Sequence, residues 1–600
     1  MKLLFIVLII VTNICVAQSE LEYNLDSVVV STNRVPLNFS EFGRTIILLS
    51  QRDIELLPST NVYDLLDQIS GVDIKQRGPE GVQADVSIRG GNFEQTLILI
   101  DGVKLIDPQT GHHNMNLPVA LSQIERVEIL KGQGTKSYGA NAFSGAINLI
   151  TKKSGNDKIG FELSGGENNF YTLGLNSSLN IGNTFHNFSF SKSKSDGYRL
   201  NTGFENYLLS VDNSFKFSNI VLNTIYGFSD KDFGANSFYS IRFPNQAEKT
   251  KTHFASVTSD INFNSFIVKP KIRWRTNSDE FVLNKFNPSF YKNNHETTVY
   301  GGELEISTNL IGGTTSFGTD YDFDKIQSSN LGNHKRTKLS FFIEQNSNLT
   351  NNFKIGIGGF LYKYTNTNWN FWPGIDIAYN LIDKIKIFAN YGKAFRIPSY
   401  TELYYSDPAN LGNKNLLPEE SSNYELGINY FSKSLLLHFS YFRKEGKNLI
   451  DYVYDNSDSI WKAQNFTKIN TNGLEVSIDF LMGNFLGFLE KTKIDYTYLK
   501  SDKIDLGELS KYTLDFLNHD LTISIFHKLP FEVEQSWSLN YEDRIILDNH
   551  FTIDTKITKK INNILFFVNV SNVLNKSYQE IPGIPLPGRW IIGGIKFNIL

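Results

Sequence analysis

The chain has 600 residues, with 58 lysines and arginines against 62 aspartates and glutamates, which gives a formal net charge of −4. Nucleic-acid binding needs clustered positive charge, so this balance argues against it. No internal apolar run approaches the roughly 20 residues of a membrane-crossing helix, which excludes a helical membrane protein. A large β-protein and a β-barrel remain.

Residues 1–17 have the pattern of an export signal. Lys2 precedes an apolar run, and small residues end the segment at Ala17. Cleavage there removes Cys15, the only cysteine of the chain, and the isoleucine before it is too large for a lipoprotein signal. We therefore expect a mature chain that begins near Gln18 and has no thiol, no disulfide and no lipid anchor.

Residues 40–152 combine helix and strand signals. Ser59 or Thr60 can cap a short helix that ends at Gly71 and places apolar residues on one face. The apolar run 96–100 ends at the turn pair Asp-Gly and is typical of a strand that enters a hairpin. Two further strands are predicted at 126–130 and 146–150, so this segment is expected to form a small α+β domain.

Within this domain, residues 107–116 form a polar, turn-rich stretch between two predicted strands, and we expect an apical loop that faces the outside. Adjacent histidines can coordinate a metal centre or hydrogen-bond to a polar ligand. Because neighbouring side chains rarely chelate one ion together, we favour a hydrogen-bonded loop and predict no metal site. The candidate ligand-binding residues are Gln109, His112, His113 and Asn114.

Residues 156–600 alternate between apolar and polar side chains with a period of two. Tyr424, Leu426 and Ile428 alternate with polar residues such as Glu425, and the same pattern returns around Glu475. At about 20 residues for each strand and its turn, this segment gives about 22 antiparallel strands. Closing them into one transmembrane barrel pairs every backbone amide, which hydrocarbon requires. The alternative is an aromatic-rich soluble β-domain.

A barrel of about 22 strands has a lumen too wide for its own side chains to fill, so the preceding domain is the available plug. The period of two points Glu425 and Glu475 into this lumen. The last residues lack the terminal aromatic common in such barrels, but Ile595 and Phe597 share a face and predict a closing strand. No grouping of Ser, His and Asp with recognisable spacing appears, and we predict that the protein is not an enzyme.

Several motifs resemble those of TonB-dependent outer-membrane receptors, in the order usual for that family. Residues 26–34 resemble the TonB box, and the plug and barrel motifs follow at 88–90, 99–103, 124–132, 138–151, 394–398, 402–404, 417–419, 424–427, 473–475 and 572–578. The resemblance implies a signal peptide at 1–17, an N-terminal extension at 18–39, a plug at 40–152 and a barrel at 156–600. It also places the protein in the outer membrane of a Gram-negative cell.

The resemblance implies that the TonB box adds as a strand to TonB, which delivers work from its inner-membrane energising complex. The alternative is that the valines form the protein's own first strand. We assign TonB coupling to Asp26, Ser27, Val28, Val29, Val30 and Ser31.

The family also holds its plug with plug cations and barrel carboxylates. Here these are Arg89 and Lys131 against Glu425 and Glu475. Lys131 replaces the usual arginine, which keeps the charge but loses bidentate geometry. The alternative is a set of separate, solvated charges.

Within the family, the chain is most like the cobalamin (vitamin B12) receptor branch. The short stretch between residues 18 and 26 leads us to expect no additional signalling domain. A ferric-siderophore receptor is the alternative. A haem receptor is less favoured, because 396–415 lack the histidine of haem receptors, and a passive porin, which would have an open lumen, is less favoured too. The cargo itself can contain cobalt or iron, but we expect no resident cofactor, and we do not assign loop calcium to Asp196, Asp230 and Asp232.

Further expectations about partners follow from the same resemblance. We expect a monomer that contacts outer-membrane lipids, is inserted by the barrel assembly machinery and binds a small-molecule ligand. A surface lipoprotein that caps the barrel is left open.

Overall fold

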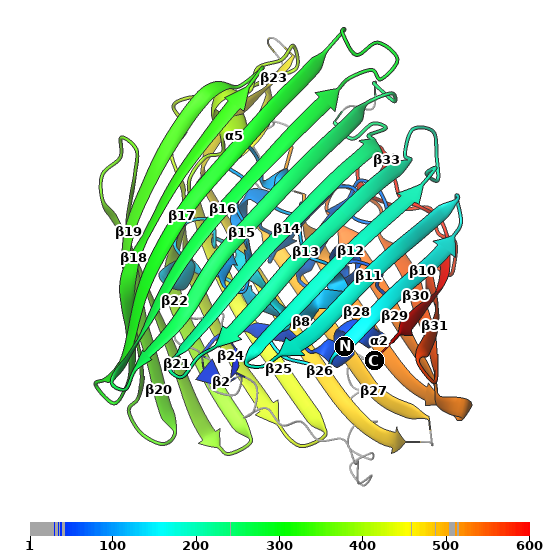
Figure 1. Cartoon of the computed structure of the whole chain (residues 1–600). Helices are drawn as coiled ribbons and strands as arrows, with labels where there is room; N and C mark the ends of the chain where they lie inside the picture. The colour runs from blue at the N-terminus through cyan, green and yellow to red at the C-terminus, as the bar shows by residue number, and fades with distance from the viewer. Residues whose placement is uncertain are drawn as a thin grey trace.

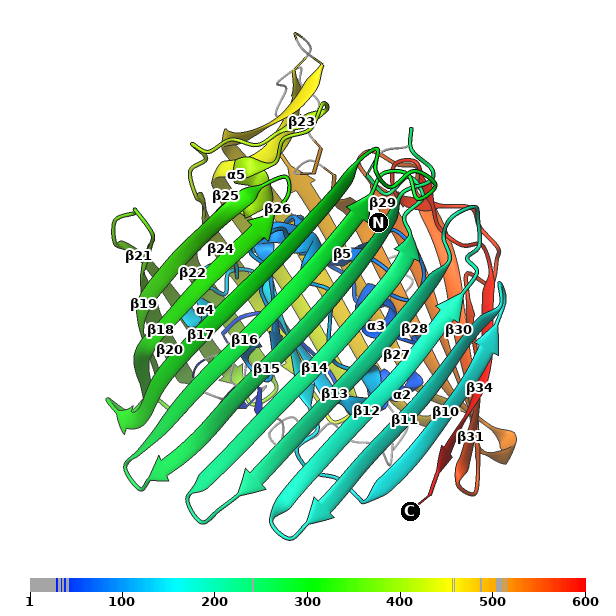
Figure 2. The same cartoon turned by 45° about the horizontal axis from the view of Figure 1, so that its top comes forward.

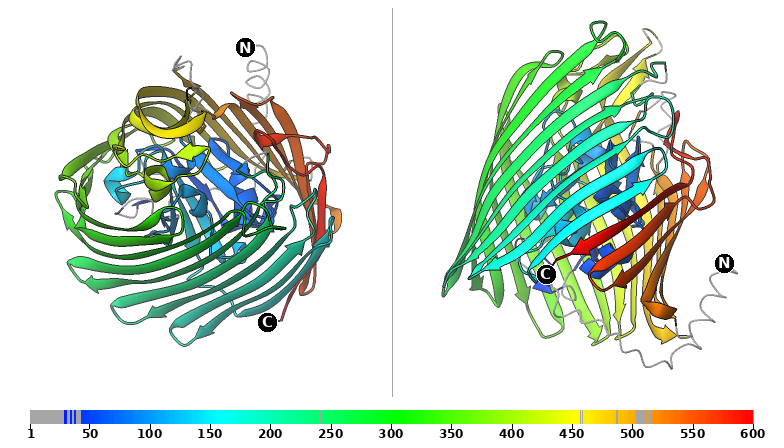
Figure 3. Two further views of the ribbon diagram at one scale, coloured as in Figure 1. Left: turned by 90° about the horizontal axis from the view of Figure 1, so that it is seen from above. Right: turned by 45° about the vertical axis from the view of Figure 1, so that its right-hand side comes forward.

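The structure, a computed structural model, describes residues 29–30, 34, 37–38, 43–239, 242–455, 457, 459–485, 488–502, 511–512 and 515–599. The predicted signal peptide at 1–17 lies outside the described residues, and so do Asp26, Ser27, Val28 and Ser31 of the predicted TonB box. The described chain forms a closed β-barrel with a smaller domain inside it, as Figures 1 and 3 show.

The described residues form a barrel of 22 antiparallel strands, which confirms the predicted fold. β10 pairs with β11 on one side and with the last strand, β34, on the other, and this pairing closes the ring. The barrel strands are β10 Lys158–Gly166, β11 Phe170–Ile181, β12 Thr184–Ser195, β13 Phe204–Lys216, β14 Ile220–Gly234, β15 Ala247–Phe263, β16 Phe266–Val282, β17 Lys292–Leu310, β18 Gly313–Ser328, β19 Gly332–Asn348, β20 Phe353–Tyr364, β21 Asn370–Ile382, β22 Ile385–Arg396, β24 Glu419–Phe431, β25 Leu435–Asp455, β26 Ile460–Phe485, β27 Leu489–Ser501, β28 Leu517–Leu529, β29 Val533–Arg544, β30 His550–Ile561, β31 Ile564–Ser571 and β34 Trp590–Asn598.

Short elements lie in the connections between these strands. The tilted view of Figure 2 shows β23 and α5 at the end of the barrel opposite the C-terminus, which we call the outer end. These connecting elements are α5 Tyr400–Tyr404, β23 Asn410–Leu411, η6 Pro530–Glu532, β32 Gln579–Ile581 and β33 Ile584–Pro585.

Side chains on the barrel strands alternate between the outer surface and the lumen. Tyr424, Leu426 and Ile428 are 43%, 57% and 41% exposed on the outside, whereas Glu425 between them is 7% exposed. A soluble sandwich would bury the apolar face instead. The exposed apolar band therefore fits a lipid-facing surface, and the charged residues point toward the plug.

The plug contains a five-stranded sheet in the order β3-β8-β9-β6-β7 and a separate hairpin, β4-β5. β6 and β9 run parallel, and the other pairs are antiparallel. Seen from above in Figure 3, the plug fills the middle of the ring of strands. Its elements are β3 Ile46–Leu49, α2 Gln51–Leu56, α3 Val62–Asp67, β4 Val72–Gln76, β5 Ala84–Ile88, η3 Phe93–Gln95, β6 Thr96–Ile100, β7 Val103–Lys104, η4 Gly111–His113, η5 Leu121–Gln123, β8 Ile124–Lys131, α4 Thr135–Tyr138 and β9 Gly145–Thr151.

The three predicted plug strands are confirmed as β6, β8 and β9. The predicted capping residue of the helix is wrong: Asn61, not Ser59 or Thr60, caps α3, because its side chain accepts a hydrogen bond from the Asp64 amide. The Thr60 hydroxyl instead donates to the Asp64 carboxylate at 2.9 Å. The helix also ends at Asp67, before Gly71.

A hydrophobic core holds the plug together and joins it to the wall. Leu65, Val127 and Leu149 are completely buried at its centre, and Phe254 and Phe526 of the barrel extend it.

Among the described residues, no helix is both long enough and apolar enough to cross a membrane.

Candidate functional site

Four charged residues meet where the plug touches the barrel wall, and we call them the latch: Arg89, Lys131, Glu425 and Glu475. Arg89 follows β5 in a left-handed conformation, with φ of 49°, and its side chain reaches the wall. Its Nη2 lies 2.6 Å from Glu425 Oε1 and 2.7 Å from Glu475 Oε2. One guanidinium thus connects β24 and β26 to the plug.

Lys131, the last residue of β8, completes the latch. Its Nζ lies 3.1 Å from Glu475 Oε1 and donates to the Ser70 carbonyl at 2.6 Å. Gly71 allows this approach, because a Cβ there would lie 2.7 Å from Lys131 Nζ and its φ is +79°. The lysine thus uses one of its donors for a backbone carbonyl, whereas an arginine would present a planar fork of donors.

Every member of the latch is buried, and the carboxylates have further partners. Glu425 also accepts hydrogen bonds from Thr45 and Asn390, both at 2.6 Å. Burial disfavours the charged form of Arg89, but the two glutamates outweigh it and raise the pKa of the guanidinium. Removing one partner from such a buried network costs about 3–5 kcal/mol, because a charge is left uncompensated. The structure therefore brings together all four residues that the sequence assigned to this site.

Other plug–barrel ion pairs were missed by the sequence reasoning. Lys136 and Arg44 of the plug both contact Asp376 of β21, with Arg44 Nη2 at 2.7 Å. The period of two could have placed Asp376 in the lumen, but no local pattern marks its plug partners. Further long-range pairs with the barrel include Lys104–Asp320, Arg275–Asp107 and Arg544–Asp73 from the plug and Arg34–Glu303 from the N-terminal extension.

The predicted apical loop, 107–116, lies at the interface between the plug and the barrel wall. Gln109 Nε2 donates to Asp279 of β16 at 3.1 Å, and Asn114 Oδ1 accepts from the Asp107 amide at 2.8 Å. Both side chains are buried, so in this conformation neither faces free solvent.

The two adjacent histidines point to different partners. His112 Nδ1 lies 2.5 Å from Asp85, whereas His113 Nε2 lies 3.5 Å from Asp279. Burial lowers the pKa of His113, but Asp279 outweighs burial and raises that pKa to about 9. Burial lowers the pKa of His112 despite the charge of Asp85. The pair therefore does not act on one ion or ligand atom together.

A cavity of about 60 Å³ opens at the outer end of the plug. We call it the outer cavity, and it is lined by plug residues and by two outer loops of the barrel. Phe93 and Tyr512 meet there edge to face, and His112 stacks on Phe93 at 4.0 Å between ring centres. The sequence reasoning missed this combination of three cations and two rings: Lys75, Arg77, Lys511, Phe93 and Tyr512.

Two residues of the predicted TonB box are described. Val29 and Val30 form β1 (Val29–Val30), which pairs antiparallel with β2 (Leu37–Asn38). The pairing occupies one edge of the two-residue strand. The valines are therefore extended, as strand addition to a partner requires.

The aspartates considered for calcium have other partners. Asp230 and Asp232 lie on β14 and pair with Lys251 and Lys249 of β15, at 3.1 and 2.6 Å. Asp196 accepts a hydrogen bond from Asn169 at 2.7 Å.

Comparisons with known proteins agree with this architecture. The model of the TonB-dependent receptor plug domain matches residues 40–146, and that of the TonB-dependent receptor-like β-barrel matches residues 132–573. The chain is 24% identical over 493 residues to the vitamin B12 transporter BtuB of Vibrio vulnificus (strain YJ016), which covers 76% of each chain.

Solved structures resemble the fold. The siderophore receptor PirA from Acinetobacter baumannii superposes with a TM-score of 0.76 and 17% identity, over 92% of this chain and 98% of that one. A variant of the ferric enterobactin receptor PfeA from Pseudomonas aeruginosa gives a TM-score of 0.78 and 17% identity, over 95% and 100%.

The family assignment rests on the barrel model, which alone spans more than half of the chain. Membership implies interaction with TonB and binding of a ligand. The closed barrel with its internal plug is the architecture expected for that activity. The chain belongs to the TonB-dependent receptors, and it is an outer-membrane transporter of a Gram-negative cell and not an enzyme.

Proposed function

We propose that this transporter imports cobalamin or a related corrinoid. The supporting observation is its similarity to a vitamin B12 transporter over three quarters of both chains. Such a ligand is far larger than the outer cavity of about 60 Å³, so binding requires the outer loops to move apart. The cargo would then displace the loops that carry Tyr512 and Ile581 from the plug surface.

A ferric siderophore is the second candidate, and the outer cavity favours it. Lys75, Arg77 and Lys511 supply cationic groups, of which Lys75 is paired with Asp515 and Arg77 with Asp85, while Phe93 and Tyr512 supply aromatic faces. An anionic complex with aromatic groups would use both features. The similar solved structures include siderophore receptors, which adds to the case for this class.

Calorimetry on the purified full-length mature protein distinguishes the candidates. We expect saturable binding of cyanocobalamin and cobinamide, with weak or no heat from ferric siderophores and haem. Binding of a ferric siderophore without binding of either corrinoid would overturn the corrinoid proposal and establish the second candidate. Conductance of the same preparation in a planar bilayer tests for an open, passive pore.

We also propose that residues 26–31 couple the transporter to TonB. Val29 lies in an extended segment, and a proline there removes a backbone donor that strand addition needs. In intact cells, Val29→Pro should abolish uptake but leave ligand binding unchanged, while Val29→Ile should preserve both. Full uptake by the proline variant would favour the alternative, in which the valines only form the protein's own first strand.

We further propose that the latch holds the plug in place until TonB pulls on it. Support comes from the burial of its charges and from its span across two barrel strands. A buried charge network gains little net stability relative to apolar residues, because exposed ions are rehydrated. Such a network therefore resists partial disruption but can be separated completely when water enters.

A further inference from the structure

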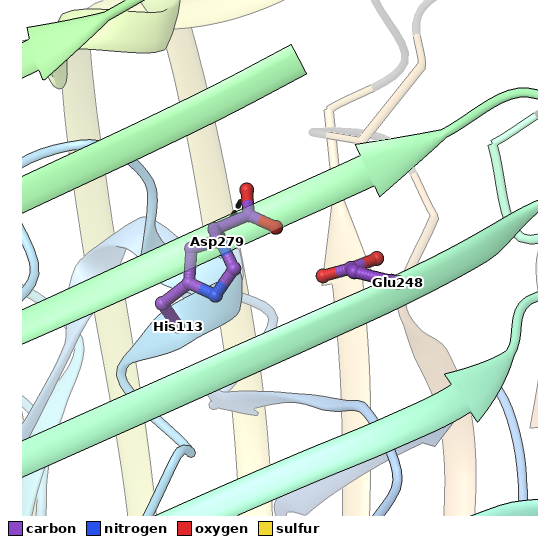
Figure 4. A group of neighbouring side chains, drawn as sticks. All are labelled: His113, Glu248 and Asp279. Carbon is purple, nitrogen blue, oxygen red and sulfur yellow. Dashed lines mark ion pairs between the residues drawn. The ribbon is translucent and has the colours of Figure 1, made fainter. Parts of the chain in front are cut away.

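A second charged cluster lies between the plug and the wall, away from the latch. It consists of His113 from η4, Glu248 near the start of β15 and Asp279 near the end of β16. Figure 4 shows the three side chains approaching one another from the plug and from two neighbouring strands. Their nitrogen and carboxylate oxygen atoms lie within 4.8 Å of one another, and all three residues are buried.

We propose that these three residues form a binding site for a divalent first-row transition metal ion, such as Zn²⁺, which ties the apical loop of the plug to the barrel wall. One imidazole and two carboxylates are ligands that such ions accept, and they leave a fourth position open. Mg²⁺ and Ca²⁺ prefer all-oxygen sites, so the histidine selects against them.

The spacing of the cluster fits metal coordination. Ligands bound tetrahedrally at about 2.1 Å from a metal lie about 3.4 Å apart. His113 Nε2 and Asp279 Oδ2 are 3.5 Å apart, which already matches this separation. Glu248 needs a shift of up to about 1.4 Å to join them, because its oxygen lies within 4.8 Å of the other two atoms.

Unpartnered buried oxygens provide an independent indication of a missing ligand. Asp279 Oδ1 and Gln109 Oε1 are both buried without a hydrogen-bond partner, in side chains only 7% and 4% exposed. Gln109 already touches Asp279 through its amide nitrogen. A half-turn of that amide would direct its oxygen into the cluster. A cation would satisfy groups that are otherwise costly to bury.

The charges around the cluster balance a divalent cation. The nearby Arg275 is paired with Asp107 at 2.5 Å, and its Nη2 donates to the His113 carbonyl, so it fixes the loop instead of neutralising the cluster. Glu248 and Asp279 contribute two negative charges, and an ion of charge +2 offsets them once it displaces the proton that His113 carries at neutral pH. Supporting contacts also exist, because the Tyr239 hydroxyl donates to Glu248 at 2.6 Å.

The cluster lies close to the outer surface of the protein. Tyr239 is 41% exposed, and its hydroxyl contacts both Glu248 and Gln83. The cluster thus lies one side chain below the outer surface. This site is separate from the outer cavity, whose lining includes none of the three proposed ligands. The inference does not depend on which cargo is transported.

The test is calorimetric titration of the full-length mature protein, without a histidine tag, with ZnCl₂ and CoCl₂. We expect one equivalent to bind, with the visible absorption of Co²⁺ in a low-symmetry nitrogen and oxygen site. Loss of a second-shell contact weakens metal sites by about 10–100-fold, so removing a ligand in His113→Ala or Asp279→Asn should cost at least about 100-fold. His550→Ala is the matched control, because His550 is a buried histidine of β30 that lies 3.8 Å from Glu542 and outside the cluster, and this variant should bind as the unaltered protein does.

Two further measurements keep the outcome decisive. Circular dichroism and the gel mobility of the unheated barrel show whether each variant is folded, and Glu248→Gln replaces any variant that is not. Hydrogen exchange should show that Zn²⁺ protects residues 107–116 in the control but not in the ligand variants. The proposal is overturned if the unaltered protein binds no stoichiometric metal, or if folded Asp279→Asn and Glu248→Gln bind it equally well.

Discussion

The latch and the outer cavity are both charged contacts between the plug and the barrel, but the barrel supplies them differently. In the latch, Glu425 and Glu475 sit on β24 and β26, which both pair with β25, and every partner is buried. At the outer cavity, Lys75 contacts Asp515 at 2.7 Å and Tyr512 contacts Phe93, both through a loop. Strands hold their side chains rigidly, whereas loops can move. The comparison indicates that barrel strands hold the plug in place at the latch, whereas barrel loops leave the plug accessible at the outer cavity.

The largest expected effect comes from Arg89→Ala. It leaves Glu425 as a buried charge without its cation and leaves Glu475 with Lys131 alone, so the plug should lose about 3–5 kcal/mol of unfolding free energy. Because the expected mature chain has no cysteine, a fluorophore on Glu55→Cys, at an exposed position of α2, reports plug unfolding in urea.

Arg52→Ala is the matched control for that experiment. Arg52 also pairs the plug with the barrel, through Glu534 at 2.6 Å, but its side chain is 46% exposed. An exposed pair contributes about 0–1 kcal/mol, so its loss should change the unfolding free energy of the plug very little. Equal losses in the two variants would break the comparison, because burial would then not set the strength of the contact.

Gly71→Ala should cause the next largest loss of unfolding free energy of the plug. An added Cβ meets Lys131 Nζ at 2.7 Å and Glu475 at 2.9 Å, in a backbone with φ of +79°. Gly102→Ala has similar backbone strain, with φ of +71°, but nothing lies within 4 Å of its Cβ. Left-handed strain alone costs about 1–2 kcal/mol. In the same urea assay, Gly71→Ala should lower the unfolding free energy of the plug more than Gly102→Ala does, and the difference measures the contact with the latch. Equal losses in the two variants would argue against close packing at Gly71.

Tyr512→Ala tests the role of the outer cavity in ligand binding. Loss of this ring should weaken ligand binding about tenfold, which corresponds to about 1.4 kcal/mol, and leave plug unfolding unchanged. Calorimetry with the ligand identified above measures the first effect. Phe286→Ala removes a 77% exposed outer-loop ring that does not line the outer cavity, and it should change neither quantity. A plug destabilised by Tyr512→Ala would show that the loop is structural.

The smallest effect should be a pH dependence at Glu94. Burial and the nearby Glu402 raise the pKa of this plug carboxyl from 4.5 to about 8. A raised acid pKa means that the folded state retains the proton, so the stability from this group is complete below pH 4.5 and is lost as pH rises through about 8.

Glu94 accepts the Gly111 amide at 2.8 Å, so its ionisation should be felt in the apical loop. Hydrogen exchange of residues 107–116, corrected for intrinsic rates, should accelerate across that pH range. Glu94→Gln removes the charge and should give a flat profile. A profile that keeps its slope in this variant would assign the titration to another group.

The sequence predicted those parts of the molecule that depend on repetition or on local motifs. The period of two was sufficient to direct Glu425 and Glu475 into the lumen, because a strand fixes side-chain direction. It could not give the capping of α3 by Asn61, since three adjacent polar residues can all serve as caps and packing selects among them.

The outer cavity and the ion pairs of Lys136 and Arg44 were beyond reach of the sequence for a different reason. Each joins residues separated by hundreds of positions, and the partner depends on how the plug is rotated inside the barrel. The separate orientations of His112 and His113 likewise depend on which wall strand faces the loop.

The pairing of β10 with β34 has a consequence for the order of events in biogenesis. The ring cannot be completed until its C-terminal strand has been synthesised, yet the plug is translated first. A domain that fills the lumen and is pinned to the wall on several sides cannot afterwards be threaded through a finished cylinder. The N-terminal domain must therefore already lie between the barrel strands, at least partly collapsed, when the last strand, β34, pairs with β10 and closes the barrel.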